Sequence, residues 1–331
     1  MEYTLFLAFV LSFLVTFVSI PIWINMTKRS GLVGKDMNKY EKNEVSEVGG
    51  IPVIMGFSAG VLLYIAITTF YFDNVSKSLF AMALLSSIFI ITIIGIVDDV
   101  LGWKIGLRQM HKPFLTLAAA LPIIVINAGH SDMALPFIGV IDFGLLYPLV
   151  LIPLAIVGAS NGFNLLAGYN GLEALMGIMI LSVLGFIAWL RDNGWISVIA
   201  LSMVFALLAF YYYNKYPARI FPGDTLTYSV GALIAAIAIL GNMEKAAVIL
   251  FIPYFFELVI KGRYKMQTEC FAIPQEDGSL KAPAKLGSST HLVIRFLSRI
   301  KKKVYEKDVL AFYVFVELFL VAVVFVEMMF Q

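Results

Sequence analysis

The sequence predicts an all-α, polytopic membrane protein with about ten transmembrane helices. Of its 331 residues, 60% are hydrophobic and only 14% are charged, and the mean hydropathy is +0.90. A soluble domain of average composition has about 25% charged residues. No segment alternates apolar and polar residues as the strands of a membrane barrel do, so the apolar runs are expected to be helices.

Ten apolar runs have lengths suited to crossing a bilayer, whose hydrocarbon core of about 30 Å takes about 20 helical residues. Their approximate bounds are 3–25, 50–71, 78–97, 112–128, 144–160, 172–190, 195–213, 225–241, 246–261 and 307–330. The first run is expected to stay in the protein, because Glu2 stands where a signal peptide has basic residues. Residues 1–331 are treated as a single transmembrane domain with one long polar loop, 262–306.

The positive-inside rule gives the orientation of this ten-span chain. The loops after the odd-numbered spans, with the residues at their edges, contain 21 of the 24 Lys and Arg residues. The other side has only Lys77, Arg191 and Lys245. The first side is therefore predicted to be cytoplasmic, with both termini outside. A basic cytoplasmic face favours an anionic substrate, although the same charges also serve to fix the topology.

The loop at 27–50 and the end of the third span supply the first acidic candidates. Glu47 directly precedes the second span and, taken alone, is interpreted as a solvated surface carboxylate. Asp98 and Asp99 are adjacent carboxylates at a membrane boundary, which favours a bound cation or a shared proton. The alternative is that they cap the segment that follows. Lys112 opens the fourth span, where its ammonium would pair with these carboxylates, contact a phosphate or snorkel to the interface.

The stretch VGASNGFNLLAGYNGLE, residues 157–173, has more amide side chains than packing in lipid explains. Asn161 and Asn164 share a helix face by their i, i+3 spacing, and the glycines from 168 to 171 are expected to break the helix. An amide oxygen suits Mg²⁺ when phosphates supply most of the negative charge. Hydrogen bonding between helices is the alternative.

Asp224 lies in FPGDT, residues 221–225, on a Pro-Gly turn that starts another helix. It is either an N-cap, worth about 1 kcal/mol, or a metal ligand. This is the third polar group at the predicted cytoplasmic face. We expect all three groups to meet there and to hold a metal-bound phosphate.

The remaining polar features of the chain carry less chemistry. The last loop contains the basic amphipathic segment HLVIRFLSRIKKKVY, which is expected to lie on the cytoplasmic leaflet. Cys270 is the one cysteine, which excludes an intramolecular disulfide, and its thiol is expected to be inert. His111 has no companion at metal-ligand spacing, so a zinc site is not expected. Glu317 and Glu327, in or near the last span, are assigned structural hydrogen bonds.

The chain resembles the polyprenyl-phosphate N-acetylhexosamine-1-phosphate transferases in four features that occur in the same order and extend over most of its length. These are VDDVLG, Lys112, NGFNLLAGYNGLE and FPGDT. GKDMNK at 34–39 and the Ser-Glu pair at 46–47 look like the eukaryotic and archaeal branch, which makes dolichyl-diphosphate N-acetylglucosamine. The bacterial branch has a histidine-rich motif where only His291 occurs here, and an Asp-Gly where this chain has Asn170 and Gly171. Both differences argue against a peptidoglycan precursor as substrate.

The resemblance implies a role for each matched residue. Asn164 and Asp224 would hold Mg²⁺, with Mn²⁺ as an alternative ion, against the diphosphate of UDP-N-acetylglucosamine. Asp98 and Asp99 would position the lipid phosphate or take up its proton, and Lys112 would contact phosphate. The substrate-binding residues that the resemblance implies around the uracil, ribose and sugar are Met37, Glu47, Asn161, Gly168, Asn170, Phe221 and Arg263.

The implied reaction is a phosphoryl transfer in which a phosphate oxygen of dolichyl or another polyprenyl phosphate attacks the β-phosphorus of UDP-N-acetylglucosamine and releases UMP. Because a phosphate monoester is already ionised near neutral pH, direct attack is favoured over a covalent aspartyl intermediate. The product, dolichyl-diphosphate N-acetylglucosamine, would be the first lipid-linked intermediate of protein N-glycosylation.

The same resemblance places the enzyme in an archaeal cell membrane or an endoplasmic reticulum membrane, among membrane lipids, with a cytoplasmic active site in its single transmembrane catalytic domain. No nucleic acid partner is expected, and a homodimer is left open. The alternative function is a membrane transporter for a phosphorylated or nucleotide-linked solute. Such a transporter would place its binding groups near the bilayer midplane on broken helices, whereas the polar clusters here gather at one face.

Overall fold

The computed structural model describes residues 5–101, 111–127, 129, 131–135 and 139–329. It is mostly helical, and eight of its described segments are long and apolar enough to cross a membrane. The protein is therefore an integral membrane protein. These segments are α1 (Phe6–Ser30), α2 (Gly50–Phe70), α3 (Ser78–Leu101), a π-helical turn with α6 (Tyr147–Leu151 and Ile152–Leu165), α7 (Leu172–Leu190), α8 (Gly194–Asn214), α9 (Gly223–Leu240) and α13 (Glu306–Met329).

Two of the ten predicted spans are shorter or broken. The fourth is 14 residues long and consists of α4 (Lys112–Thr116), a 3-10 segment (Leu117–Ala120) and α5 (Leu121–Val125). The ninth is split into α10 (Glu244–Leu250) and α11 (Ile252–Arg263). Proline explains the interruptions, since it removes one backbone hydrogen bond and clashes with the carbonyl four residues before it. Pro122 and Pro253 each lie in the first turn of the segment that follows an interruption.

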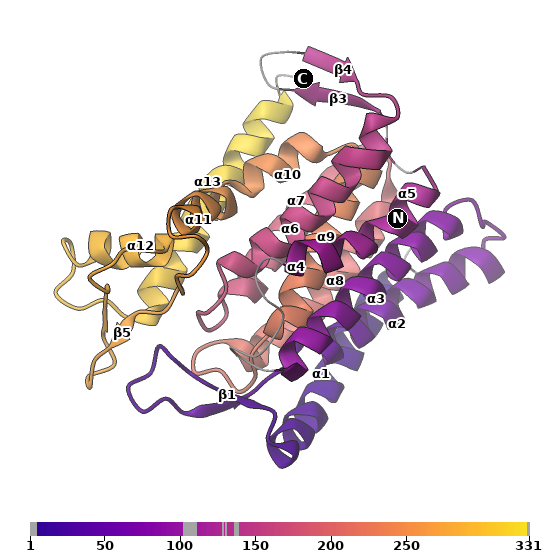
Figure 1. Ribbon diagram of the computed structural model, residues 1–331. Helices are drawn as coiled ribbons and strands as arrows, with labels where there is room; N and C mark the ends of the chain where they lie inside the picture. The colour runs from indigo at the N-terminus through magenta and orange to yellow at the C-terminus, as the bar shows by residue number, and fades with distance from the viewer. Residues whose placement is uncertain (1–4, 102–110, 128, 130, 136–138, 330–331) are drawn as a thin grey trace.

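α9 lies at the centre of the bundle (Figure 1), in contact with α2, α3, α6 and α7. In its most apolar window 83% of the residues are buried, against 28% in α1 and in α13. Two glycines allow its neighbours to approach closely. A Cβ atom on Gly95 of α3 would lie 2.6 Å from the Cα of Thr225, and one on Gly231 of α9 would lie 2.3 Å from the carbonyl oxygen of Ala159. Small residues therefore fix α9 between α3 and α6.

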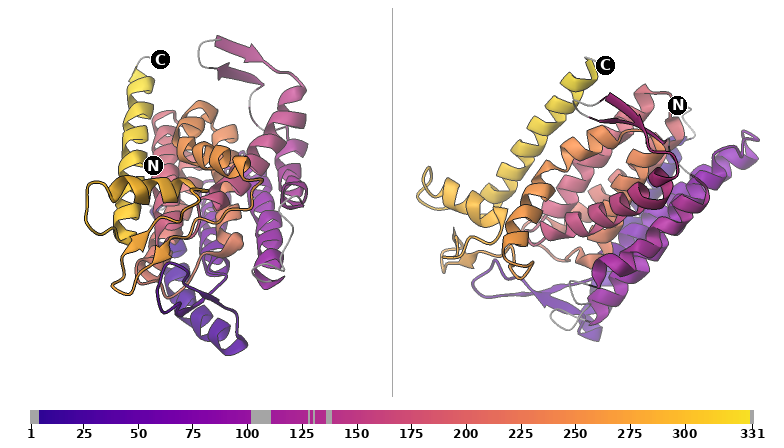
Figure 2. Two further views of the ribbon diagram at one scale, coloured as in Figure 1. Left: turned by 60° about the vertical axis from the view of Figure 1, so that its left-hand side comes forward. Right: turned by 45° about the horizontal axis from the view of Figure 1, so that its top comes forward.

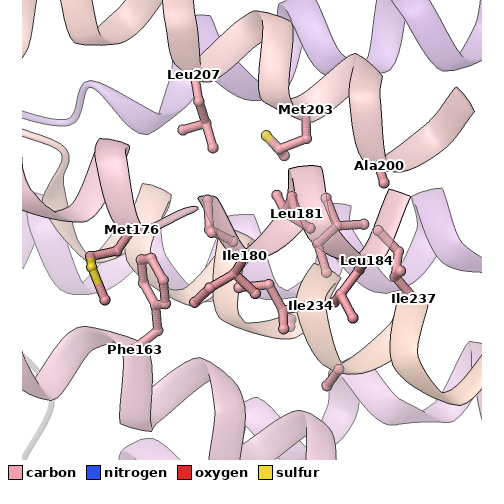
Figure 3. Close-up of a cluster of buried hydrophobic side chains, with 14 of the residues drawn as sticks. Phe163, Met176, Ile180, Leu181, Leu184, Ala200, Met203, Leu207, Ile234 and Ile237 are labelled. Carbon is pink, nitrogen blue, oxygen red and sulfur yellow. The ribbon is translucent and has the colours of Figure 1, made fainter. Parts of the chain in front are cut away.

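Apolar side chains fill the space between α6, α7, α8 and α9 (Figure 3). The ten labelled residues there point toward one another from these four helices. They are Phe163, Met176, Ile180, Leu181, Leu184, Ala200, Met203, Leu207, Ile234 and Ile237. This packed layer holds the helix ends, which carry the polar residues, in a fixed arrangement.

In the described part of the chain, three pairs of antiparallel strands lie between helices. β1 (Val33–Lys35) pairs with β2 (Glu44–Ser46), β3 (Asp132–Leu135) with β4 (Gly139–Asp142), and β5 (Ile273–Pro274) with β6 (Leu280–Lys281). Figures 1 and 2 show β1 and β5 at one end of the bundle and β3–β4 at the other, beside the C-terminal end of α13. We call the first the β1/β5 end. All of the polar clusters predicted from the sequence lie toward it.

The last loop contains α12 (Ser289–Leu297), which crosses α13 instead of running along it (Figure 2). His291, Val293 and Ile294 are buried on its inner face, while Arg295 and Phe296 are exposed. The helix is thus amphipathic, as predicted, but its inner apolar face packs on the protein itself.

The two acidic residues of the last span differ. Glu327 forms an ion pair with Lys245 of α10, so a structural bond is confirmed there. Glu317 is fully buried, and among the described residues neither of its carboxylate oxygens has a hydrogen-bond partner. The prediction of a structural hydrogen bond for Glu317 is therefore wrong.

Candidate active site

Lys112 holds two carboxylates from different helices together at the β1/β5 end. Its Nζ lies 2.7 Å from Oδ2 of Asp98, at the end of α3, and 2.8 Å from Oδ2 of Asp224, in the first turn of α9. The hydroxyl of Tyr228, one turn further along α9, donates to the same Asp98 oxygen at 3.3 Å. Lys112 is only 13% exposed, so it pairs with these carboxylates and does not snorkel.

Asp99 caps α9 from a neighbouring helix. Its Oδ1 accepts the backbone N–H of Asp224 at 2.7 Å, and its Oδ2 accepts the N–H and the hydroxyl of Thr225 at 3.0 and 2.5 Å. The residue at the N-cap position, Pro222, provides no side-chain cap of its own. A carboxylate at this place satisfies free N–H groups and the positive end of the helix dipole.

This arrangement decides one of the readings left open above. Asp224 is not the N-cap of its helix, because α9 begins at Gly223. Asp99 caps that helix, and the alternative, a cap on the segment that follows in the chain, falls on residues 102–110, outside the described residues. Gly223 has a φ of +70°, and a Cβ atom there would lie 2.4 Å from Oδ2 of Asp99. Only glycine provides both this backbone conformation and the room for the carboxylate.

Glu47, at the end of the β1–β2 hairpin, lies near the same carboxylates. It is half-buried, and burial raises its pKa, as does the negative charge of Asp224. The interpretation as a solvated surface residue is therefore wrong. A Cβ atom on Gly34 would lie 2.0 Å from Oε1 of Glu47, so the hairpin places Glu47 close against its own first strand.

The backbone of Phe221 joins this hairpin to the start of α9. Its N–H donates to the carbonyl oxygen of Ser46 at 2.7 Å, and its own carbonyl accepts the N–H of Gly49 at 2.9 Å. Residues on both sides of Glu47 are therefore tied to Phe221, three positions before Asp224.

The two asparagines of α6 bridge helices. Oδ1 of Asn164 accepts the hydroxyl of Thr227 at 3.0 Å, one turn beyond Asp224 in α9. Nδ2 of Asn161 donates to the hydroxyl of Thr116 in the short fourth segment at 3.0 Å. Interhelical hydrogen bonding, the alternative reading, is thus observed for both. It leaves a metal-binding role of Asn164 open, because a carbonyl oxygen has two lone pairs.

These residues fit a Mg²⁺ ion that is completed by substrate. Mg²⁺ takes oxygen ligands, keeps several waters, and is commonly held by one or two carboxylates plus substrate phosphates. Asp98 and Asp224 already hold a cation between them, which is the Lys112 ammonium. The side-chain oxygen of Asn164 bonds to α9, the helix that carries Asp224. Across the described part of the chain, no group of three or more His, Cys, Asp or Glu side chains is arranged to hold a metal ion. A site here would therefore depend on phosphate oxygens.

The turn between α6 and α7 breaks the helix at the predicted glycines. Gly168 has a φ of +132°, and its N–H donates to Oε1 of Glu173 at 2.6 Å. Asn170 is buried, its N–H donates to Glu306, and its Nδ2 donates to Oδ2 of Asp36 at 3.1 Å. The backbone N–H and one side-chain N–H of Asn170 are thus engaged within the protein, and its substrate contact stays a prediction.

Two other predicted substrate residues form no described bond to the carboxylates. Met37 is half-buried in the loop between β1 and β2, and Arg263 is exposed at the last residue of α11. Among the described contacts, neither side chain forms a hydrogen bond or ion pair with Asp98, Lys112 or Asp224. Their roles stay predictions.

The sequence reasoning missed several residues around the site. Thr225 and Tyr228 bond to Asp99 and Asp98, and their positions just after Asp224 at a helix start are a signal that would have found them. Four more residues bind the turn at 168–171 or one another, namely Asp36, Asn38, Lys39 and Glu306. The bonds from the loop between β1 and β2 to Gly168, Asn170 and Glu306 span more than 100 residues, and sequence spacing gives no sign of them.

His291 has a structural role in the last loop. Its Nδ1 accepts the N–H of Gly287 at 3.2 Å, so its Nε2 carries the proton and donates to the carbonyl oxygen of Phe271 at 2.9 Å. Burial lowers the pKa of His291. Nearby, burial raises the pKa of the Cys270 thiol to about 11, which fits an inert thiol.

Comparisons with known proteins agree with the motif order. A family model for glycosyl transferase family 4 matches residues 79–242. A Saccharolobus solfataricus protein, provisionally named UDP-N-acetylglucosamine–dolichyl-phosphate N-acetylglucosaminephosphotransferase, is 39% identical over 299 residues, 89% of each chain. The protein of that name in Dictyostelium discoideum is 29% identical over 82% of this chain and 72% of its own.

A bacterial relative is also similar. The phospho-N-acetylmuramoyl-pentapeptide-transferase of Halalkalibacterium halodurans is 30% identical over 262 residues, which cover 76% of this chain and 79% of the relative. The segment matched by the family model contains Asp98, Asp99, Lys112, Asn164 and Asp224. The resemblance drawn from the motifs is confirmed, and the chain belongs to glycosyl transferase family 4.

Proposed function

We propose that this protein transfers N-acetylglucosamine-1-phosphate from UDP-N-acetylglucosamine to dolichyl or a similar polyprenyl phosphate, with release of UMP. The names of the archaeal and eukaryotic relatives support both substrates. The observation that carries the proposal is the Lys112 ammonium held between Asp98 and Asp224 at 2.7 and 2.8 Å. Phosphoryl transfer depends mainly on positioning and on neutralising charge, and this cluster supplies both.

In the proposed reaction, an oxygen of the lipid phosphate forms a bond to the β-phosphorus of the nucleotide sugar. The bond from that phosphorus to the α–β bridging oxygen breaks, and its electron pair leaves with UMP. Lys112 would contact phosphate oxygens, and Asp98 would orient the lipid phosphate or take up a proton from it. Asn164 and Asp224 would hold Mg²⁺, which when bound neutralises charge on the diphosphate.

Asp99 has a positioning role in this proposal and does not touch the substrate. Three hydrogen bonds from the start of α9 occupy its two oxygens. These bonds fix the first turn of α9, and with it the direction of the Asp224 side chain. The Glu47 end of the hairpin, attached through Phe221, would close the polar side of the same site.

The active site is proposed to face the cytosol. The β1/β5 end carries the loops that hold most of the 21 basic residues counted above, and the positive-inside rule places such loops in the cytoplasm. The water-soluble nucleotide sugar would reach the carboxylates from that side. The lipid phosphate would reach them from the membrane, with its hydrocarbon chain along the apolar helices.

The test is UMP release by purified protein in detergent or nanodiscs. UDP-N-acetylglucosamine, polyprenyl phosphate and MgCl₂ are supplied together and then omitted one at a time. The proposal expects UMP only in the complete mixture, together with a lipid-linked diphosphate sugar detected by mass spectrometry. UMP formed without the lipid would indicate hydrolysis and contradict it. Competition with other UDP-sugars then identifies the preferred sugar.

A further inference from the structure

Asn38 joins three segments that are far apart in the sequence. It lies in the loop between β1 and β2 and is only 3% exposed. Its Nδ2 donates to the carbonyl oxygen of Gly168 at 2.8 Å, and its Oδ1 accepts the N–H of Ala272 at 3.0 Å. One amide thus connects the first loop, the turn between α6 and α7, and the segment that leads into β5.

Asp36 and Glu306 fix the same turn through Asn170. Oδ2 of Asp36 accepts Nδ2 of Asn170 at 3.1 Å, and Oε1 of Glu306 accepts its N–H at 2.6 Å. Both carboxylates are buried, with 6% and 3% exposed. Lys39 forms an ion pair with Glu306 and lies 3.8 Å from Oδ2 of Asp36. The Lys39 ammonium therefore compensates two buried acids, which are costly to bury unpaired.

The opposite end of the hairpin lies at the carboxylate cluster. Val33, Gly34 and Lys35 pair with Ser46, Val45 and Glu44, so a short antiparallel ladder connects the loop at 36–43 to the Glu47 end. The charge of Asp224 acts on Glu47, and Phe221 is bonded to the residues on both sides of it. The position of the loop is thereby coupled to the position of Glu47.

We propose that Asp36, Asn38, Lys39 and Glu306 form a loop clamp that sets the separation between the β1–β2 hairpin and the turn at 168–171. The clamp positions these two walls on the nucleotide-sugar side of the active site, and its residues do not contact the substrate. The inference rests on the proposed function. The walls are polar loops outside the apolar spans, so the clamp acts on the soluble substrate and not on the lipid.

The experiment compares Asn38→Ala and Lys39→Met with the matched control Tyr40→Phe. Tyr40 lies in the same loop, and its hydroxyl forms one exposed hydrogen bond, with Glu276 at 3.2 Å. KM is measured separately for UDP-N-acetylglucosamine and for polyprenyl phosphate, together with kcat and the thermal unfolding midpoint. Each clamp variant is expected to raise the first KM about tenfold, the scale of one lost buried hydrogen bond. The lipid KM should stay within about twofold, and Tyr40→Phe should change neither.

Lys39→Arg keeps the positive charge and is expected to recover most of the affinity that Lys39→Met loses. An unchanged KM for UDP-N-acetylglucosamine in both clamp variants, or an equal rise for both substrates, would overturn the clamp. Should Asn38→Ala fail to fold, the Lys39 pair of variants decides the outcome. If the wild-type protein releases no UMP, the proposed function fails instead, so the two failures are distinguishable.

Discussion

The Lys112 side chain compensates two acids that come from different helices. Both acids lie in a partly buried site, where like charges repel strongly, and the Lys112 ammonium between them lowers this repulsion. Its ammonium also marks where a cation is stable between these acids. We therefore expect it to contribute both to holding the site together and to the proposed transfer.

Lys112→Met is predicted to lower kcat by roughly 10²–10³-fold, the scale of removing one positioned group that stabilises transition-state charge. The rate of UMP release at saturating substrates measures this. Lys245→Met is the control, because Lys245 pairs with Glu327 near the C-terminal end of α13. Equal rates for Lys112→Met and wild type would remove Lys112 from the reaction.

Thr225 is the residue whose hydroxyl most directly holds Asp99, at 2.5 Å. Thr225→Val keeps the shape of the side chain and is expected to destabilise the protein by about 1–2 kcal/mol, since Asp99 loses a buried hydrogen-bond donor. The midpoint of thermal unfolding in detergent reports the change. The control is Thr68→Val, whose hydroxyl bonds only to carbonyls of its own helix. A Thr225→Val midpoint equal to that of the control would contradict the cap.

At the scale of elements, α12 depends on a neutral histidine. Because the folded pKa of His291 is lowered by burial, its stabilising contribution is present above the unfolded pKa of about 6.5. That contribution is lost as the pH falls through the lowered folded pKa. The imidazolium would place a second N–H against the N–H of Gly287, which donates to Nδ1.

The thermal midpoint of the wild-type protein is therefore predicted to fall between pH 7 and pH 5 more steeply than that of His291→Gln. The variant should be less stable at pH 7, because it loses the two ring contacts, yet show a flatter profile. Parallel profiles over this range would show that His291 does not titrate in the way its burial requires.

Sequence reasoning located the long helices well where apolar runs end at polar residues. The run at 172–190 has the bounds of α7, and the glycines at 168–171 do break the chain between α6 and α7. The prediction failed at α10 and α11, where a continuous apolar run contains the interruption before Pro253. The mean hydropathy of such a run does not reveal that its helix is interrupted, whereas the backbone hydrogen bonds of the structure do.

Part of the site was also predictable from polar residues at the ends of apolar runs. Asp98, Lys112 and Asp224 were singled out because acids and a cation at the ends of apolar runs need partners, and the structure pairs them. The capping of α9 by Asp99 was not predictable, because it depends on how closely α3 packs on α9 at Gly95. Asn38 was missed since its partners lie 130 and 234 residues away.

On the scale of the whole molecule, the bundle brings the ends of α3, α4, α6 and α9 together at its β1/β5 end. The centre of the bundle is packed with apolar side chains (Figure 3), and the polar residues that the family resemblance selected lie where the packed helices end. Membership of glycosyl transferase family 4 fits this plan, in which a rigid membrane core supports a site built from helix ends and loops.

The central claim, that this end of the bundle is a Mg²⁺-dependent transferase site, is tested most directly by Mg²⁺ titrations of UMP release. Wild-type protein is compared with Asp224→Ala and Asn164→Ala, each checked for an unchanged thermal midpoint and with Thr68→Val as control. The account predicts saturable Mg²⁺ activation in the wild type and the control, with turnover abolished in both site variants at every concentration. Wild-type rates that ignore Mg²⁺, or near-normal rates in both folded variants, would contradict it.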